Sequence, residues 1–200
     1  EIITPEEITT PITLGSNANP NSIYGEITEK GEEDFYTFIG TPGQRIYFDR
    51  LFLNSTSSSA LDAEIYSPSG QKVFSRNFRC GSDLDPITLD ESGTYRVRLN
   101  ASEENTGTYS FNILDLGNSI PIDLDRNYTG TLEPGQETHF YNFTGNEGQR
   151  LYLDTSGGSG TSNTNWTLYD SSNKSVGNSS LNNDIEVLLT KTDNYTLAIR

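Results

Sequence analysis

The sequence contains few of the residues on which catalytic and metal sites usually depend. Its 200 residues include one cysteine, Cys80, one histidine, His139, and no methionine. One cysteine excludes an intrachain disulfide, and one cysteine with one histidine falls short of the ligands of an ordinary zinc site. A serine or cysteine hydrolase needs an imidazole base, and we expect His139 to be a surface residue at the edge of a strand. We therefore expect a protein that is not an enzyme.

Long apolar runs and helical periodicity are also absent. No run of about 18 apolar residues occurs, so the sequence predicts no membrane-spanning helix. The formal net charge of −15 repels nucleic acid and anionic lipid, so we expect no nucleic-acid partner and no membrane insertion. The same charge attracts cations, calcium above all, although it also serves solubility alone. Scarce cysteine fits a secreted or cell-surface bacterial protein, so we expect an extracellular location.

The sequence does contain many short runs rich in Ile, Val, Tyr, Phe and Thr, separated by Gly, Asn, Ser, Asp and Pro. These runs predict β-strands joined by turns. In the first half they lie near Ile23–Ile27, Phe35–Ile39, Arg45–Phe52, Ala63–Ser67, Lys72–Ser75, Ile87–Leu89, Thr94–Leu99 and Thr108–Leu114. A spacing of about 8–12 residues without helical crossovers predicts an antiparallel β-sandwich.

One ten-residue phrase occurs twice. Residues 40–49 read GTPGQRIYFD and residues 145–154 read GNEGQRLYLD, with six of ten positions identical and a separation of 145 − 40 = 105. Other segments recur in the same order, such as FYTFIG at 35–40 and FYNFTG at 140–145. No helix follows the phrase to bind a phosphate, so it indicates a turn and a strand and not a site. The sequence predicts an all-β protein with two tandem antiparallel β-sandwich domains.

The repeat suggests how the chain is divided. We assign an N-terminal extension, a first repeat, a linker and a second repeat to residues 1–11, 12–116, 117–121 and 122–200. The second repeat lacks its last strand, because its alignment with the first places Arg200 opposite Asn100. A sheet that lacks a strand exposes unpaired backbone. Either a neighbour donates the strand in trans, for example its residues Glu1–Thr4, or the sequence is part of a longer array.

Several motifs occur in a fixed order: DFYTFIG from Asp34, GQRIYFD from Gly43, SPSG from Ser67 and GTYRV from Gly93. This order resembles the bacterial pre-peptidase C-terminal domain family, in the tandem form found in large surface and secreted proteins. The resemblance implies a jelly-roll-like β-sandwich without catalytic activity. In some members it also implies calcium held by an Asn-, Glu- and Asp-rich segment, which here matches Asn17, Asn19, Asn21, Glu32 and Asp34.

Other candidate sites follow from the residues themselves. Calcium prefers several oxygen ligands, and alternate carboxylates lie on one side of an extended segment. Two such pairs are Asp83 with Asp85 and Asp123 with Asp125, although solvated loop acids would look the same. Trp166 and Tyr169 align with Ala63 and Tyr66 of the first repeat. They are candidates for stacking on a sugar ring or for filling the core.

These observations predict a non-catalytic structural or adhesive tandem-repeat segment of a large extracellular bacterial protein, with calcium as a candidate stiffening cofactor. The expected partners are neighbouring repeats of the chain and a cell-surface, matrix or polysaccharide ligand. One alternative is a binding module for polysaccharide or protein fibres, which would need exposed aromatic residues on one sheet face. The other is an accessory domain of a secreted hydrolase.

Overall fold

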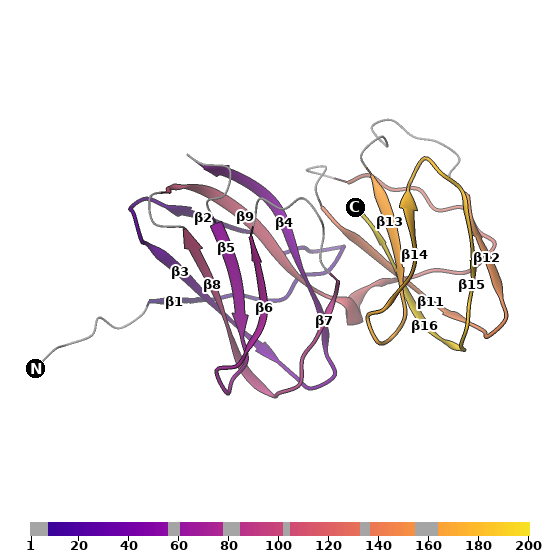
Figure 1. The fold of residues 1–200 in the computed structure, drawn as a ribbon, viewed down its shortest axis with the longest axis horizontal. Helices are drawn as coiled ribbons and strands as arrows, with labels where there is room; N and C mark the ends of the chain where they lie inside the picture. Colours follow the sequence, from indigo (N-terminus) through magenta and orange to yellow (C-terminus); the bar gives the residue numbers. More distant parts are fainter. Residues whose placement is uncertain (1–7, 56–60, 78–84, 102–104, 133–136, 155–163) are drawn as a thin grey trace, which may run out of the picture. The chain divides into compact units, whose positions relative to one another are not determined.

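The computed structural model describes residues 8–55, 61–77, 85–101, 105–132, 137–154 and 164–200 (Figure 1). Cys80, Asp83 and Glu1–Thr4 lie outside the described residues. The described residues form strands and one 3-10 turn, Leu116–Asn118, which confirms the predicted all-β class. None of their helical segments reaches the length and hydrophobicity that crossing a bilayer requires. The chain divides into two units, Glu1–Gly15 with Asn19–Asp115 and Ser16–Ala18 with Leu116–Arg200.

The first sheet of the first unit has five strands in the order β1-β3-β8-β5-β6. Their bounds are β1 Thr9–Pro11, β3 Glu33–Gly40, β8 Gly93–Ala101, β5 Leu61–Tyr66 and β6 Lys72–Asn77. All neighbours are antiparallel except β1, which runs parallel to β3. Residues 9–11 of the expected extension therefore form an edge strand of the first unit. Pro11 is tolerated there because an edge strand does not need every N–H.

The second sheet of the first unit has four antiparallel strands in the order β2-β9-β4-β7. Their bounds are β2 Ile23–Ile27, β9 Gly107–Asp115, β4 Arg45–Ser55 and β7 Ile87–Thr88. All the strands predicted for this half are present, with ends that differ by a few residues. β9 lies in the interior of the sheet, because it pairs with β2 on one edge and with β4 on the other.

The two sheets of the first unit bury a single hydrophobic core. Strand β9 supplies Tyr109, Phe111 and Ile113, which are all buried in it. The ring of Phe111 stacks on that of Phe48, with 5.0 Å between centroids, and meets Tyr36 edge-on at 5.5 Å. Burying one large apolar side chain stabilises a fold by about 1.5–3 kcal/mol. The inward face of β9 is therefore a large contributor to this unit.

Tyr109 also organises a polar contact next to the core. Its hydroxyl donates to Oδ2 of Asp34, and the hydroxyls of Tyr109 and Tyr36 lie 2.7 Å apart. Burial raises the pKa of Asp34, and the hydrogen bond from Tyr109 lowers it in part. The ring of Tyr109 packs against Gly25, where a Cβ atom would come within 2.2 Å of the hydroxyl oxygen. Gly25 therefore makes room for Tyr109.

The repeated ten-residue phrase forms the same corner in both units. Gly43 and Gly148 have φ values of 80° and 79°, a conformation that favours glycine. The N–H of Gly43 donates to Leu89 at 2.8 Å, and that of Gly148 donates to Leu189 at 2.8 Å. The side chain of the following glutamine, Gln44 or Gln149, accepts a backbone N–H of the same turn in each case. The phrase is a turn with its strand, as the sequence predicts.

The first sheet of the second unit has the order β10-β11-β16-β13-β14, with β10 parallel to β11 and the rest antiparallel. Their bounds are β10 Ile120–Pro121, β11 His139–Gly145, β16 Asp193–Ile199, β13 Asn165–Tyr169 and β14 Ser175–Ser180. This arrangement matches the first sheet of the first unit strand by strand. The second sheet has two described strands, β12 Arg150–Leu153 and β15 Ile185–Leu188, which correspond to β4 and β7.

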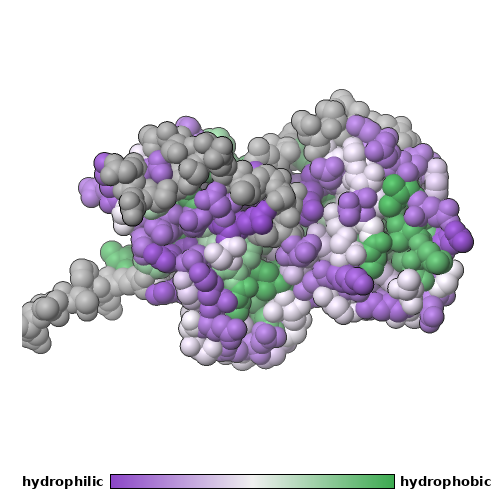
Figure 2. Space-filling view, in the orientation of Figure 1, coloured by the Kyte–Doolittle hydropathy of each residue, from purple (hydrophilic) through white to green (hydrophobic). Residues whose placement is uncertain are grey.

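In each unit, hydrophobic surface is exposed on one side, between an edge strand of one sheet and an edge strand of the other. Figure 2 shows hydrophobic surface between β6 and β7 of the first unit and between β14 and β15 of the second. Partly buried members of the two cores include Val73 and Ile87 in the first case and Val176 and Ile185 in the second. The two cores are thus built on the same plan, each with its own set of buried side chains.

The contact of Tyr109 with Asp34 can be tested by replacing Tyr109 with Phe, which removes the hydroxyl and keeps the ring. We expect the free energy of unfolding of the first unit to fall by about 1–2 kcal/mol, because a partly buried carboxylate loses its donor. Because the pKa of Asp34 is raised in the folded state, ionising this carboxyl lowers stability as the pH rises from about 3.9 through the raised value. The hydrogen bond from Tyr109 stabilises the ionised form of Asp34. The free energy of unfolding lost in Tyr109→Phe is therefore expected to be larger at about pH 7 than at about pH 4.

Urea unfolding at the two pH values measures this difference. Tyr24→Phe is the matched control, because it removes the same hydroxyl from a tyrosine that is 77% exposed. Equal deficits of Tyr109→Phe at both pH values would contradict the assignment of Asp34 as the partner that matters.

Candidate functional site

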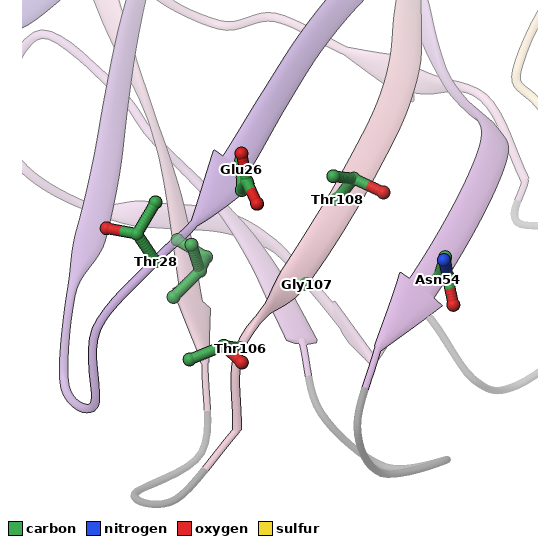
Figure 3. A pocket seen from close by; sticks show the side chains of 7 residues that line it. Glu26, Thr28, Asn54, Thr106, Gly107 and Thr108 are labelled. Atoms are coloured by element: carbon green, nitrogen blue, oxygen red, sulfur yellow. The ribbon is translucent and has the colours of Figure 1, made fainter.

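A shallow groove of about 380 Å³ lies at one end of the β2-β9-β4 sheet (Figure 3). It is lined by Glu26, Ile27, Thr28, Asn54, Thr106, Gly107 and Thr108. Glu26, Thr108 and Asn54 lie directly opposite one another on the three adjacent strands, because Thr108 pairs with both of the others. The strand register thus places a carboxylate, a hydroxyl and a carboxamide in one row.

Two exposed aromatic residues lie in the next row of the same sheet face. Tyr24 and Phe52 both pair with Ser110, one from each side. Their side chains are 77% and 50% exposed. Strands are about 4.8 Å apart, so the two residues are separated by about 10 Å across the sheet. We call Tyr24, Glu26, Phe52, Asn54 and Thr108 the outer face of this sheet.

Alternation in the sequence predicts that Phe52 faces the core, whereas the structure exposes it. Ile46 and Phe48 face the core, and strict alternation along β4 would also turn Phe52 inward. A bulge between Arg50 and Phe52 shifts the register by one residue, so that Leu51 is buried and Phe52 is exposed. The outer face was therefore missed, although the alternation within Ile23–Ile27 already turns Tyr24 away from Ile27.

The chemistry of the outer face suits binding better than catalysis. Among its described residues, Glu26 is the one carboxylate, and no histidine, cysteine or lysine accompanies it. Acid–base and covalent mechanisms need a second group within hydrogen-bond reach. Hydroxyl and carboxamide groups beside exposed rings instead favour a ligand that has both hydroxyl groups and flat apolar faces.

Two of the predicted calcium ligands have structural partners of their own. Oε2 of Glu32 accepts from the N–H of Thr28 at 2.6 Å, from its hydroxyl at 2.8 Å and from the N–H of Glu29 at 2.8 Å. The backbone bond from Glu29 and the other donors lower the pKa of Glu32. Asp34 accepts from Tyr109. Glu32 therefore closes a turn, and Asp34 belongs to the contact with Tyr109.

Two of the three asparagines of the predicted calcium segment also have backbone partners of their own. Asn17 belongs to the second unit, where its side chain accepts from the N–H of Phe140 at 3.0 Å and donates to the Phe140 carbonyl at 2.7 Å. The Asn21 side chain donates to the carbonyl of Leu14 at 3.2 Å. Asn19 is exposed. The amides of Asn17 and Asn21 thus hold the backbone in place.

The remaining acidic candidates are exposed. Asp123 pairs with Arg126 at 3.3 Å, Asp125 adopts a φ of 62° in a turn, and Asp85 lies at the surface. In the part of the chain that the structure describes, no group of three or more His, Cys, Asp or Glu side chains is placed to hold a metal ion. Calcium binding stays a prediction.

The predicted stacking residues are core residues. Trp166 and Tyr169 are 1% and 0% exposed, and Trp166 belongs to the hydrophobic core of the second unit. Their burial favours the core-filling alternative, which alternation along β13 alone could not distinguish from stacking because it does not say which side of the sheet is covered. His139 is half-buried on β11, with Nε2 at 3.2 Å from Glu137 Oε2.

No protein-family model and no curated protein matches the chain. Among solved structures, it is similar to the pre-peptidase C-terminal domain of a collagenase from Bacillus anthracis. The identity is 15%, the match covers 56% of this chain and 99% of that one, and the TM-score is 0.40. It is also similar to PliG of Aeromonas hydrophila, a periplasmic inhibitor of g-type lysozyme, with 17% identity, 52% and 95% coverage and a TM-score of 0.38. The solved structures similar to the chain therefore include a pre-peptidase C-terminal domain.

The assignment of Glu32 to a turn can be tested with Glu32→Gln. A neutral amide oxygen accepts more weakly than a carboxylate, so we expect the free energy of unfolding of the first unit to fall by roughly 1 kcal/mol at neutral pH. Because the pKa of Glu32 is lowered in the folded state, its contribution is present above about pH 4.3 and is lost as the pH falls through the lowered value. The deficit should therefore shrink in acid.

Urea unfolding with and without added calcium is the measurement, and Glu29→Gln on the same turn is the control. If calcium shifts the midpoint of the parent protein and Glu32→Gln abolishes that shift, Glu32 is a metal ligand and its assignment to the turn is wrong.

Proposed function

We propose that this chain is a non-catalytic tandem-repeat segment of a large extracellular bacterial protein, with a structural or adhesive role. The observation that supports it is the matched construction of the two units. Their first sheets have the same strand order, including a parallel edge strand, and the repeated phrase forms the same corner in each. Repeated modules with separate cores suit a protein that extends or presents other domains.

Further contacts recur at corresponding turns. Glu91 accepts from the hydroxyl of Ser67 at 2.7 Å in the first unit. Asp193 accepts from the hydroxyl of Ser171 at 2.9 Å in the second. The first bond joins the turn after β5 to the residues just before β8, and the second joins the turn after β13 to the start of β16. Such bonds hold loops in place.

A second candidate function is supported by the outer face of the β2-β9-β4 sheet. Tyr24 and Phe52 are exposed on either side of Ser110, and the row of Glu26, Thr108 and Asn54 follows beside them. Aromatic faces stack on sugar rings, and hydroxyl, amide and carboxylate groups bond sugar hydroxyls. By contrast, aromatic rings on the outside of the other sheet are covered, since Arg96 lies 5.2 Å from the ring of Phe35.

The proposed modular role predicts that the two units unfold independently. Val97 is buried in the first core, and Val97→Asp places an unpaired charge there, which we expect to unfold that unit. Trp166 is the one tryptophan of the chain and is buried in the second core, so its fluorescence reports the second unit alone. In Val97→Asp, we expect Trp166 fluorescence to report a stability of the second unit against urea that lies within about 0.5 kcal/mol of its value in the parent protein.

Leu168→Asp in the second core is the matched control, because it should abolish the fluorescence transition while the tyrosine signal of the first unit persists. Simultaneous loss of both transitions in Val97→Asp would show one cooperative domain and would contradict the proposal.

The binding role predicts that the chain co-sediments with an insoluble polysaccharide such as cellulose through its outer face. We expect the double substitution of Tyr24 and Phe52 by Ala to weaken binding about tenfold or more, since each ring contributes on the order of 1 kcal/mol. Stability should change little, because both side chains are exposed. Tyr152→Ala is the control, because Tyr152 is 67% exposed and lies on the second unit. Equal binding by the double variant and the control would rule out this face.

A further inference from the structure

The exposed groups on the β2-β9-β4 sheet lie in two parallel rows that run across the strands. In the first row, Tyr24 and Phe52 lie on either side of Ser110. We call the residues of the next row the polar row: Glu26, Thr108 and Asn54. Because neighbouring strands are about 4.8 Å apart and a strand rises about 3.3 Å per residue, each row spans about 10 Å and the rows lie about 7 Å apart. Two rings thus occupy one side of this surface, and a carboxylate and a carboxamide occupy the other.

The two aromatic side chains lie on either side of a residue that is itself covered. Ser110 lies on the outer side of β9, because Tyr109 and Phe111 belong to the core, yet it is only 3% exposed. Tyr24 and Phe52 are 77% and 50% exposed. Side chains directly opposite one another on neighbouring strands come into contact. A ligand that lies along this row therefore rests on the two rings and does not enter a pocket between them.

Regular strands fix the distance between the two rings. Tyr24 belongs to β2 and Phe52 to β4, and both strands pair with β9 in the interior of the sheet. The bulge between Arg50 and Phe52 turns Phe52 outward at the level of Ser110. A binding surface built on strands needs little ordering when a ligand arrives, which lowers the entropic cost of binding.

The polar row follows one side of the aromatic row and borders the groove. Figure 3 shows Glu26, Thr108 and Asn54 side by side on adjacent strands. The groove of about 380 Å³ adds the hydroxyl groups of Thr28 and Thr106. Carboxylate, hydroxyl and carboxamide groups both accept and donate the hydrogen bonds that sugar hydroxyls form. A ligand on the two rings therefore has hydrogen-bonding groups along one of its edges.

The charge of this surface disfavours anionic ligands. Among the described residues of the outer face and the groove, none is Lys, Arg or His, and Glu26 is a carboxylate. The chain as a whole has a formal net charge of −15. An anionic polymer would therefore meet repulsion without a counter-charge on this face. The charge favours an uncharged ligand that is rich in hydroxyl groups.

The spacing of the rings points to one class of uncharged polysaccharide. In an extended chain of β-1,4-linked pyranose sugars, successive rings are turned over, so that every second sugar presents the same apolar face to one side. The length of this two-sugar repeat matches the separation of Tyr24 and Phe52, which is about two interstrand distances. The hydroxyl groups lie around the edges of the sugar rings and point sideways from the chain, toward the polar row. An α-1,4-linked chain coils and does not keep this spacing.

We propose that the outer face binds an uncharged β-1,4-linked polysaccharide whose chain runs across the strands, with one sugar on Tyr24, the next over Ser110 and the third on Phe52. Stacking on the two rings supplies most of the affinity. The polar row bonds the hydroxyl groups along one edge of the chain and excludes anionic chains. The inference rests on the second candidate function above, to which it adds the linkage of the sugar, the direction of the chain and a minimum length of three sugars.

The length is tested by titrating soluble cello-oligosaccharides of two to six sugars into the whole chain and measuring the heat of binding. We expect the association constant to rise about tenfold from the disaccharide to the trisaccharide, because the third sugar reaches the second ring. Longer oligosaccharides should bind only slightly more tightly than the trisaccharide. The same series of manno-oligosaccharides and N-acetylchito-oligosaccharides identifies the sugar, and the step from two to three sugars is expected in at least one of the three series.

Removal of either ring should abolish the step. In Tyr24→Ala or Phe52→Ala one stacking contact remains, so the trisaccharide should bind no more tightly than the disaccharide. Tyr152→Ala is the control and should retain the step, because Tyr152 is a 67% exposed tyrosine of the second unit. Urea unfolding of each variant shows that a lost step is not a loss of the fold.

Linkage and charge are tested separately. Maltohexaose, which has α-1,4 links, should bind about tenfold or more weakly than the β-1,4-linked hexasaccharide of the series that binds. In gels that contain polymer, carboxymethylcellulose should retard the chain less than uncharged hydroxyethylcellulose does. Glu26→Gln should narrow this difference, because it removes the carboxylate that repels an anionic chain. Glu29→Gln is the matched control, because Glu29 is an exposed carboxylate outside the outer face.

Three results would overturn the proposal. One is an affinity that does not change between two and three sugars in any of the three series; another is a step that survives Phe52→Ala. The third is equal binding of maltohexaose and the β-1,4-linked hexasaccharides. If the chain binds insoluble cellulose through Tyr24 and Phe52 without any step in length, the crosswise chain is refuted while the second candidate function stands. Failure to bind any of these sugars or polymers refutes both.

Discussion

The packing of β9 into the middle of its sheet is the contact on which the rest of the first unit depends. It joins β2 to β4 through backbone bonds on both edges and supplies three large side chains to the core. Tyr109 then constrains two residues far from it in sequence. Gly25 must lack a side chain because the ring of Tyr109 occupies that space. Asp34 accepts a hydrogen bond from the Tyr109 hydroxyl, although the two residues are 75 positions apart. The carboxylate of Asp34, one of the predicted calcium ligands, is thus the acceptor of a structural hydrogen bond.

The same contact explains how the two units differ. Their first sheets match in order and direction, and their corners are held by the same bonds. The difference lies in the second sheet, where the first unit has four described strands with β9 in the interior and the second unit has two described strands. The outer face of the first unit also depends on β9, because Thr108 and Ser110 bring residues of β2 and β4 into common rows.

Much of the architecture could be predicted from local patterns, and most of the candidate site could not. Alternation and turn residues gave the strands of the first unit, and the repeat gave the corner at Gly43 and Gly148. The exposure of Phe52 escaped prediction because a one-residue bulge reverses the faces of β4 after Arg50. Whether Trp166 fills the core or stacks on a ligand stayed open, because alternation identifies two faces of a strand without saying which one is covered.

Strand positions and the two-fold repeat follow from the order of residues, because backbone preferences and side-chain periodicity act over a few neighbouring positions. The partners of Glu32, Asp34 and Asn17 and the outer face beside Tyr24 were settled by folding. Each depends on which strands become neighbours, and therefore on contacts between residues that no short pattern in the chain connects.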